Sequence, residues 1–226
     1  MTMVRTLNHE FFKTWTPEMA YVLGYFAADG SLNTGHGGSY IEFKSVDRKM
    51  IENVREAIGS SHRISQYERG GNCKTCYRLQ ISSRVWARDL QGFGFTPKKS
   101  KTMRFPLVPA EYIGHFVRGY FDGDGCVYSQ MLKYADRDHK RWILLTLFTS
   151  GSKVFLEQLW SILKDHGIRG GSLVPKKRGF ELKFSHRDSL ALYQLMYHTA
   201  PISDLYLLRK RAKLEQAIQV LDLLRA

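Results

Sequence analysis

The fold of this chain is decided by two seven-residue stretches, Gly24-Tyr25-Phe26-Ala27-Ala28-Asp29-Gly30 and Gly119-Tyr120-Phe121-Asp122-Gly123-Asp124-Gly125. They are identical at five of seven positions and lie 95 residues apart. The apolar residues that precede them also agree in type, and a proline stands upstream of each. Self-similarity of this kind indicates two copies of one structural unit within the 226 residues.

The segments that follow each stretch repeat the same order of elements. Apolar period, helix caps and Gly/Pro punctuation predict strands and helices at 40–44, 47–58, 62–68, 75–81 and 84–91, then at 142–148, 150–166, 171–176, 180–185 and 187–197. The intervening 33–39 and 130–140 are expected to be loops, and 205–224 a final helix. We therefore predict an α+β fold of two pseudo-symmetric αββαββα halves with antiparallel sheets. The expected bounds are 1–15 for an N-terminal extension, 16–96 and 109–226 for the halves, and 97–108 for a linker.

Each repeated stretch lies in a helix that contains an unfavourable glycine. Glycine inside a helix costs about 1 kcal/mol relative to alanine, yet Gly24 and Gly119 occupy the same place in the two copies. Ala20, Gly24 and Ala28 are four residues apart and share one helix face. Because small residues at this spacing let two backbones approach closely, we predict that the two helices cross at Gly24 and Gly119 and form the interface between the halves.

Both predicted helices end in Asp-Gly, at Asp29 and Asp124. The glycine is a common C-terminal stop, but a carboxylate is disfavoured at the negative end of a helix. Two neighbouring carboxylates also disfavour each other's ionisation. Divalent cations would compensate, and Mg²⁺ is the hard, oxygen-preferring choice. The alternative is that both are ordinary turn residues; their repetition favours the metal.

The charge of the chain favours a polyanionic partner. It has 34 Lys and Arg against 21 Asp and Glu, a net charge of +13 and a pI near 9.7. The excess is +6 in residues 1–112 and +7 in 113–226, so it is not confined to a tail. Nucleic acid is the usual partner of such a protein, although a merely basic protein is the alternative. The three cysteines and the absence of a long apolar run favour an intracellular protein without a membrane span, in a compartment that we do not predict.

With their preceding residues, the stretches 22–30 and 117–125 resemble the two signature helices of the LAGLIDADG homing endonucleases in their single-chain, two-repeat form. This resemblance implies that the motif helices pack at a pseudo-symmetry axis and that each sheet forms half of a saddle over DNA. It implies that Asp29 and Asp124 are catalytic acids that bind metal, together with the backbone carbonyls of Ala28 and Gly123. The chain departs from the family at motif position two, where Arg118 is expected to face outward, and at position six, where Asp122 stands.

The resemblance also implies a basic residue near each acid. Lys99 and Lys210 are the candidates, with Lys98 and Lys101 as near alternatives; a solvated or phosphate-contacting lysine is the competing interpretation. Two or more Mg²⁺ ions are expected as cofactors, and Mn²⁺ is expected to substitute.

Strand alternation predicts the face that would contact DNA. If Ile64, Tyr77 and Leu79 face the core, the polar residues between them face outward, and Arg, Lys and Gln can recognise base edges. Any single member could instead be a solvent-facing charge. The predicted DNA-binding residues are Lys44, Arg63, Tyr67, Arg69, Arg78, Gln80, Lys176, Lys177, Arg178 and Lys183.

The sequence thus predicts a monomeric, site-specific endonuclease that cuts double-stranded DNA across the minor groove, leaves 3′ overhangs and serves intron or intein mobility. The alternative is a nucleic-acid binder of the same fold that does not cleave, such as an RNA maturase or a DNA-binding regulator.

Overall fold

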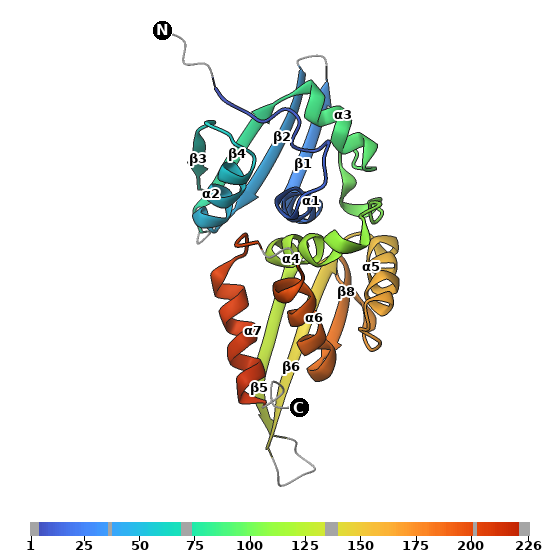
Figure 1. The fold of residues 1–226 in the computed structure, drawn as a ribbon. Coiled ribbons are helices and arrows are strands. Elements are labelled where there is room, and N and C mark those ends of the chain that lie inside the picture. The colour runs from blue at the N-terminus through green and yellow to red at the C-terminus, as the bar shows by residue number, and fades with distance from the viewer. Residues whose placement is uncertain (1–4, 36–37, 69–73, 134–139, 201–202, 222–226) are drawn as a thin grey trace. The chain divides into compact units, whose positions relative to one another are not determined.

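The computed structural model describes residues 5–35, 38–68, 74–133, 140–200 and 203–221 (Figure 1). The chain divides into two compact units. The first contains Met1–Lys99, Pro106–Gly123 and Pro201–Tyr206, and the second contains Ser100–Phe105, Asp124–Ala200 and Leu207–Ala226. These units differ from the two sequence repeats because the second motif helix belongs to the first unit, where it packs on the first motif helix.

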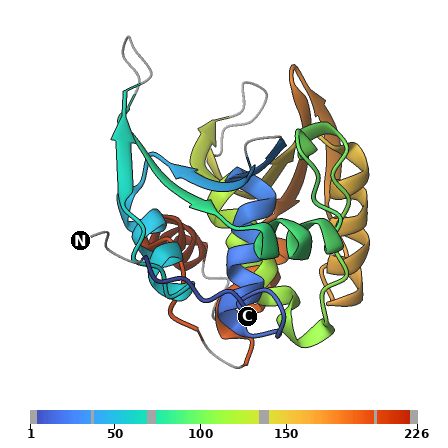
Figure 2. The same ribbon diagram turned by 90° about the horizontal axis from the view of Figure 1, so that it is seen from above.

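The first unit is a four-stranded antiparallel sheet with helices on one face (Figure 2). Its elements are α1 (Pro17–Asp29), β1 (Gly30–Gly35), β2 (Gly38–Ser45), α2 (Arg48–Ala57), β3 (Ile64–Tyr67), β4 (Cys76–Ser82), α3 (Arg84–Gly92), η2 (Ala110–Tyr112) and α4 (Ile113–Asp124), whose last residue begins the second unit. The strand order is β1-β2-β4-β3. Ile41, Phe43, Leu79 and Ile81 are fully buried and form the apolar face of the sheet.

The second unit repeats this topology. After η1 (Lys99–Lys101), which spans the unit boundary, it contains β5 (Gly125–Lys133), β6 (Lys140–Ser150), α5 (Lys153–Asp165), β7 (Ser172–Lys176), β8 (Gly179–Ser185), α6 (His186–His198) and α7 (Leu208–Val220). Its strand order, β5-β6-β8-β7, matches that of the first sheet. The predicted α+β class and the repeated αββαββα order are confirmed, and the final helix α7 packs on β5 and α6. Across the described segments, no helix combines the length and apolar character needed to cross a membrane.

The first motif helix begins at a side-chain cap followed by a proline. The Thr16 hydroxyl accepts a hydrogen bond from the backbone N–H of Met19 at 3.1 Å, and Pro17 occupies the first turn. Nine consecutive residues, from Met19 to Ala27, are buried. A helix buried on all sides belongs to the centre of a core rather than to a surface.

Helices α1 and α4 approach each other through backbone atoms at the two repeated glycines. A Cβ atom on Gly24 would overlap the carbonyl oxygen of Phe116 and lie 3.0 Å from the nitrogen of Tyr120. Reciprocally, a Cβ atom on Gly119 would overlap the carbonyl oxygen of Tyr21 and lie 2.9 Å from the nitrogen of Tyr25. The predicted crossing at Gly24 and Gly119 is therefore present within the first unit.

Arg118 does not face outward, so that prediction was wrong. Its side chain is 2% exposed, because the 203–206 segment covers this side of α4. The Arg118 Nε donates to the carbonyl of Leu205 at 2.8 Å, Nη2 lies 3.0 Å from His115 Nδ1, and the guanidinium stacks over the Tyr21 ring. Buried charge is tolerated when it is partnered in this way.

The segments that follow the motif helices are strands, not loops throughout. Strand β1 starts at Gly30 and pairs with β2 along its whole length, and β5 does the same with β6 from Gly125. Gly30 has φ −80° and ψ 154°, so the helix stops at an extended residue rather than at the left-handed glycine that ends many helices. Glycine is required there because a Cβ atom would collide with the Phe26 ring.

We predict that Gly24→Ala and Gly119→Ala each lower the free energy of unfolding by about 3 kcal/mol, because neither backbone can yield to the added methyl group. Urea unfolding followed by circular dichroism measures this. The control is Gly92→Ala in α3, where an added Cβ meets nothing within 4 Å; this change is expected to leave stability equal or raised by up to about 1 kcal/mol. Equal effects at all three positions would contradict the backbone contact.

Candidate active site and nucleic-acid interface

The two motif helices end at their acidic residues. Asp29 is the last residue of α1 and is exposed, and Asp124 is the last residue of α4 and is half-buried. Neither helix has a basic residue in its last turn. Two carboxylates are thus presented to solvent at the negative ends of otherwise buried helices.

Close packing in the first unit continues to the end of α1. A Cβ atom on Gly123 would overlap the side chain of Ala28 and lie 3.3 Å from Oδ2 of Asp29. The absence of a side chain at Gly123 therefore leaves room for the Asp29 carboxylate beside the last turn of α4. The Asp29 carboxylate also affects Tyr25. Burial, and then the charge of Asp29, raise the pKa of the Tyr25 hydroxyl well above its usual value.

The candidate lysines both reach a backbone carbonyl close to a motif acid. Lys99 is 5% exposed, and its Nζ donates to the carbonyl of Ala27 at 2.8 Å, two residues before Asp29. Lys210 is 9% exposed, and its Nζ donates to the carbonyl of Gly125 at 2.7 Å, directly after Asp124. The near alternatives Lys98 and Lys101 are exposed. Burial and the contact with Ala27 thus separate Lys99 from its neighbours in the sequence.

The face of the first sheet that its helices leave open carries most of the predicted polar residues. Register places Lys44 opposite Arg78, and Glu42 opposite Gln80, and residues directly opposite in an antiparallel pair share a face. Tyr67 on β3 lies close to this group, because the Arg78 guanidinium stacks over its ring. Arg63 is exposed just before β3, and Arg69 lies outside the described residues.

The open face of the second sheet carries both basic and apolar residues. Lys176 and Lys183 lie on it, and Lys177 and Arg178 form the exposed turn between β7 and β8. The adjacent strand β6, however, presents half-buried apolar residues between Arg141 and Thr149, namely Ile143, Leu145 and Leu147. The four predicted basic residues thus lie on β7, β8 and their turn, and β6 adds an apolar strip beside them.

Each open face holds one acid among its basic side chains. Glu42 Oε2 lies 2.6 Å from Lys44 Nζ, and Glu42 Oε1 lies 3.6 Å from Arg78 Nη1. In the second sheet, Glu181 lies 3.0 Å from Lys176 and 3.3 Å from Lys183. Both acids are largely buried beneath the basic side chains that they hold.

Solved structures share this fold, and a family model matches part of the sequence. The homing endonuclease I-WcaI, bound to its DNA recognition sequence, has a TM-score of 0.61 at 13% identity over 91% of this chain and 90% of that one. The LAGLIDADG meganuclease I-AabMI, bound to uncleaved DNA, has a TM-score of 0.61 at 15% identity over 93% and 92%. Residues 16–91 match the family model described as a LAGLIDADG-like domain. The chain has the two-repeat LAGLIDADG fold.

The LAGLIDADG fold is not confined to proteins named as endonucleases. Full-length DUF199/WhiA from Thermatoga maritima has a TM-score of 0.57 at 13% identity over 97% of this chain and 65% of that one. Identities this low establish the fold alone.

Two curated relatives share a part of the chain. An A-type ATP synthase subunit of Methanopyrus kandleri is 27% identical over 124 residues, and the RNA polymerase subunit Rpo1C of Methanocaldococcus jannaschii is 25% identical over 114 residues. The matches cover 55% and 49% of this chain but only 12% and 13% of the relatives.

Some residues that shape the LAGLIDADG helices were not predicted from the sequence. Asp122, at motif position six, accepts a hydrogen bond from the Tyr21 hydroxyl at 2.7 Å, which joins α4 to α1. The sequence held a signal for this contact: Asp122 stands where the first copy has Ala27, and a buried acid needs a partner. The pairing of Glu42 with Lys44, two residues apart on one strand face, was also visible in the alternation.

Proposed function

We propose that this protein is a metal-dependent endonuclease that cuts double-stranded DNA at a long, specific site. The observation that carries the proposal is the pair of motif helices: they pack through glycine backbones, each ends in a carboxylate, and a buried lysine contacts a carbonyl beside each end. The fold shared with DNA-bound homing endonucleases supports it. The protein would act as a monomer, with one acid serving each DNA strand.

The donor set fits Mg²⁺ better than other metals. Among the described residues, no group of three or more His, Cys, Asp and Glu side chains could hold an ion, so a zinc site or a calcium cage made of protein side chains has no support there. Mg²⁺ keeps several waters and binds through one or two carboxylates and substrate phosphates. Asp29 and Asp124, with the backbone carbonyls of Ala28 and Gly123, would hold two or more such ions, and Mn²⁺ would substitute.

When bound, the ions would neutralise phosphate charge and activate a water for in-line displacement. The protein's own contribution is to hold the reacting groups in place. Asp29 and Asp124 would each anchor a metal ion at the end of one motif helix. The ammonium groups of Lys99 and Lys210 would supply positive charge where negative charge develops on the phosphate. Cleavage across the minor groove with 3′ overhangs is part of the proposal.

The open sheet faces would bind the duplex. In the first unit, Arg78 and Gln80 project from adjacent positions of one strand face, and their groups suit guanine and adenine edges respectively. Lys177 and Arg178, at a turn, suit phosphates, which position a protein without specifying sequence. Glu42 and Glu181 would fix the orientation of the basic side chains around them.

A binder of the same fold that does not cleave, such as a DNA-binding regulator or an RNA maturase, is the competing function. The similarity to DUF199/WhiA keeps it open, because the fold there accompanies a protein not named as a nuclease. The presence of an acid at the end of both motif helices favours cleavage.

The partial matches support a role in intron or intein mobility. An ATP synthase subunit and an RNA polymerase subunit have different functions, yet each contains a related segment that covers about an eighth of its length. A segment found in both proteins is more readily explained as a unit inserted into each chain than as a functional part of the ATP synthase or the RNA polymerase.

The direct test is incubation of the purified protein with a plasmid library of partially randomised targets in Mg²⁺, followed by sequencing of linearised molecules. The proposal expects one enriched site with 3′ overhangs. Tight DNA binding without cleavage in Mg²⁺ or Mn²⁺ would favour the competing function.

We predict that Asp29→Asn and Asp124→Asn each abolish double-strand cleavage while DNA binding persists, because the amide removes a charged metal ligand. Plasmid linearisation and gel-shift affinity measure the two properties. Asp165→Asn is the matched control, since Asp165 is also an exposed last residue of a helix, α5, and it should cleave normally. Cleavage by either motif variant at the wild-type rate would refute the assignment of the acids.

We predict that Lys99→Met and Lys210→Met slow cleavage by about a hundredfold, the size of one lost electrostatic contact to the transition state. DNA affinity should change little, and single-turnover kinetics separates the two effects. Lys101→Met, an exposed neighbour in η1, is the control. Thermal unfolding of each variant shows whether lost activity comes from lost stability after the carbonyl contact is broken. An unchanged cleavage rate in folded Lys99→Met would exclude a catalytic role for Lys99.

We predict that Glu42→Gln raises affinity for random-sequence DNA several-fold and lowers discrimination, because Lys44 and Arg78 lose the acid that holds them. The dependence of log affinity on log salt should become steeper by about one unit. Fluorescence anisotropy with random and selected duplexes measures both quantities. Glu52→Gln, which removes an acid from helix α2 instead, should change neither.

A further inference from the structure

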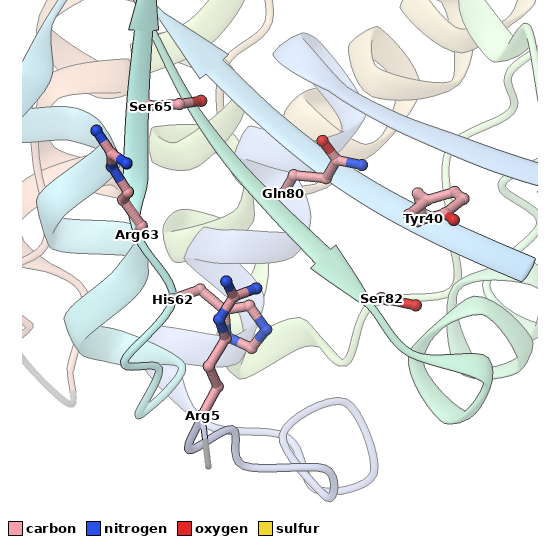
Figure 3. A pocket seen from close by; sticks show the side chains of 7 residues that line it. All are labelled: Arg5, Tyr40, His62, Arg63, Ser65, Gln80 and Ser82. Carbon is pink, nitrogen blue, oxygen red and sulfur yellow. The ribbon is translucent and has the colours of Figure 1, made fainter. Parts of the chain in front are cut away.

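A pocket of about 320 Å³ lies on the first unit, at one end of the open sheet face (Figure 3). Three basic or potentially basic residues line it: Arg5 from the N-terminal segment, and His62 and Arg63 from the residues just before β3. No acidic side chain is among the described residues that line it. Its composition therefore favours an anion.

The floor of the pocket belongs to the strands. Tyr40 comes from β2, Ser65 from β3, and Gln80 and Ser82 from β4, and Figure 3 shows Gln80 between Ser65 and Tyr40. Tyr40 and Ser82 are opposite each other in the sheet register. All four groups can donate a hydrogen bond through a hydroxyl or an amide. Gln80 also connects the pocket to the face that we propose to bind DNA.

Arg5 is held at the pocket by a network of backbone contacts. The N–H of Thr6 donates to Ser61 Oγ at 2.8 Å, and the N–H of Ser61 donates back to the Thr6 carbonyl at 3.2 Å. Two residues further, the N–H of Asn8 donates to the carbonyl of Ile58 at 3.2 Å. Arg5 thus belongs to a segment bound to the same loop that supplies His62.

His62 and Arg5 are close enough to interact electrostatically. Burial, and then the charge of Arg5, lower the pKa of His62 from its usual value. The ring is anchored as well, with Nδ1 2.8 Å from the hydroxyl of Ser60. An anion bound beside Arg5 would offset the charge of Arg5 and so favour protonation of His62.

We propose that this pocket binds one phosphate of the DNA backbone through Arg5, beyond the side chains that contact bases. A phosphate oxygen only accepts hydrogen bonds, whereas every base pair presents a donor as well as acceptors in the major groove, and the pocket offers guanidinium, hydroxyl and amide donors. Guanidinium groups match phosphate geometry. The inference rests on the proposed DNA-binding function and adds to it a backbone contact made by the segment before α1.

The first test compares Arg5→Ala with Arg88→Ala, which removes the same charge from an exposed position on α3. Arg5→Ala is expected to weaken binding to random-sequence and selected duplexes equally, by about tenfold at low salt. It should also lower the salt slope by about one unit, while Arg88→Ala changes neither. Weaker binding to only one sequence class would overturn the phosphate assignment in favour of base contact.

The second test scans the selected duplex with single methylphosphonate substitutions, each of which removes one phosphate charge. One position should weaken wild-type binding about tenfold and leave Arg5→Ala binding unchanged, because the contact is already lost. Equal losses in both proteins at every position would refute the pocket while leaving the endonuclease proposal intact. A wild-type protein that binds no DNA would overturn both.

Inorganic phosphate distinguishes a free anion from the DNA backbone. If it shifts the amide resonances of Thr6 and Ser61 at millimolar concentration while Arg5→Ala binds DNA normally, the pocket serves a small phosphate instead, and the proposal fails. Shifts that disappear when duplex DNA is bound would support competition for one site.

Discussion

The structure depends on one backbone contact, the crossing of α1 and α4 at Gly24 and Gly119. Each glycine faces a carbonyl oxygen of the other helix. No side chain lies between the two backbones that could rearrange if one helix moved along the other. A slip of one residue would place a side chain at the crossing, so the register of the helices is fixed. Strand β1 begins directly after α1, and β5 directly after α4. Each motif acid therefore stands at a rigid junction between a helix and the first strand of a sheet.

Burial of the helix pair also explains the two residues of α4 that depart from the LAGLIDADG motif pattern. Ten consecutive residues of α4, from Ile113 to Asp122, are buried, so a polar residue in this helix must find a partner inside the protein. Arg118 finds the Leu205 carbonyl, and Asp122 finds the Tyr21 hydroxyl. Burial, and then the charge of Asp122, raise the pKa of Tyr21 well above its usual value, so this phenol stays protonated and keeps donating to Asp122.

The repeat in the sequence predicted the fold because it fixed the order of elements, and the two-residue period of β4 predicted the face of Arg78 and Gln80. Both are local properties of the chain. The outward orientation predicted for Arg118 failed because a segment nearly 90 residues later covers it, and no local pattern reports that. The strand at Gly30 was missed because its polar residues resemble a loop until β2 is beside it. The burial of Lys99 likewise depends on the path of the folded chain, which brings this residue to the Ala27 carbonyl. Its neighbours Lys98 and Lys101 look the same in the sequence but are exposed.

The distribution of charge on the open faces bears on how such a protein would select DNA. A face with cations alone would attract any duplex, because phosphate attraction does not depend on sequence. Here the strand cations Lys44 and Lys183 are held by Glu42 and Glu181, whereas Arg5, Lys177 and Arg178 lie before α1 or at a turn. If the protein binds DNA as we propose, the charges before α1 and at the turn would bind phosphates and orient the duplex. The strand cations would leave their acids only where a base offers a better partner, so the same number of positive groups would give more discrimination and less general affinity.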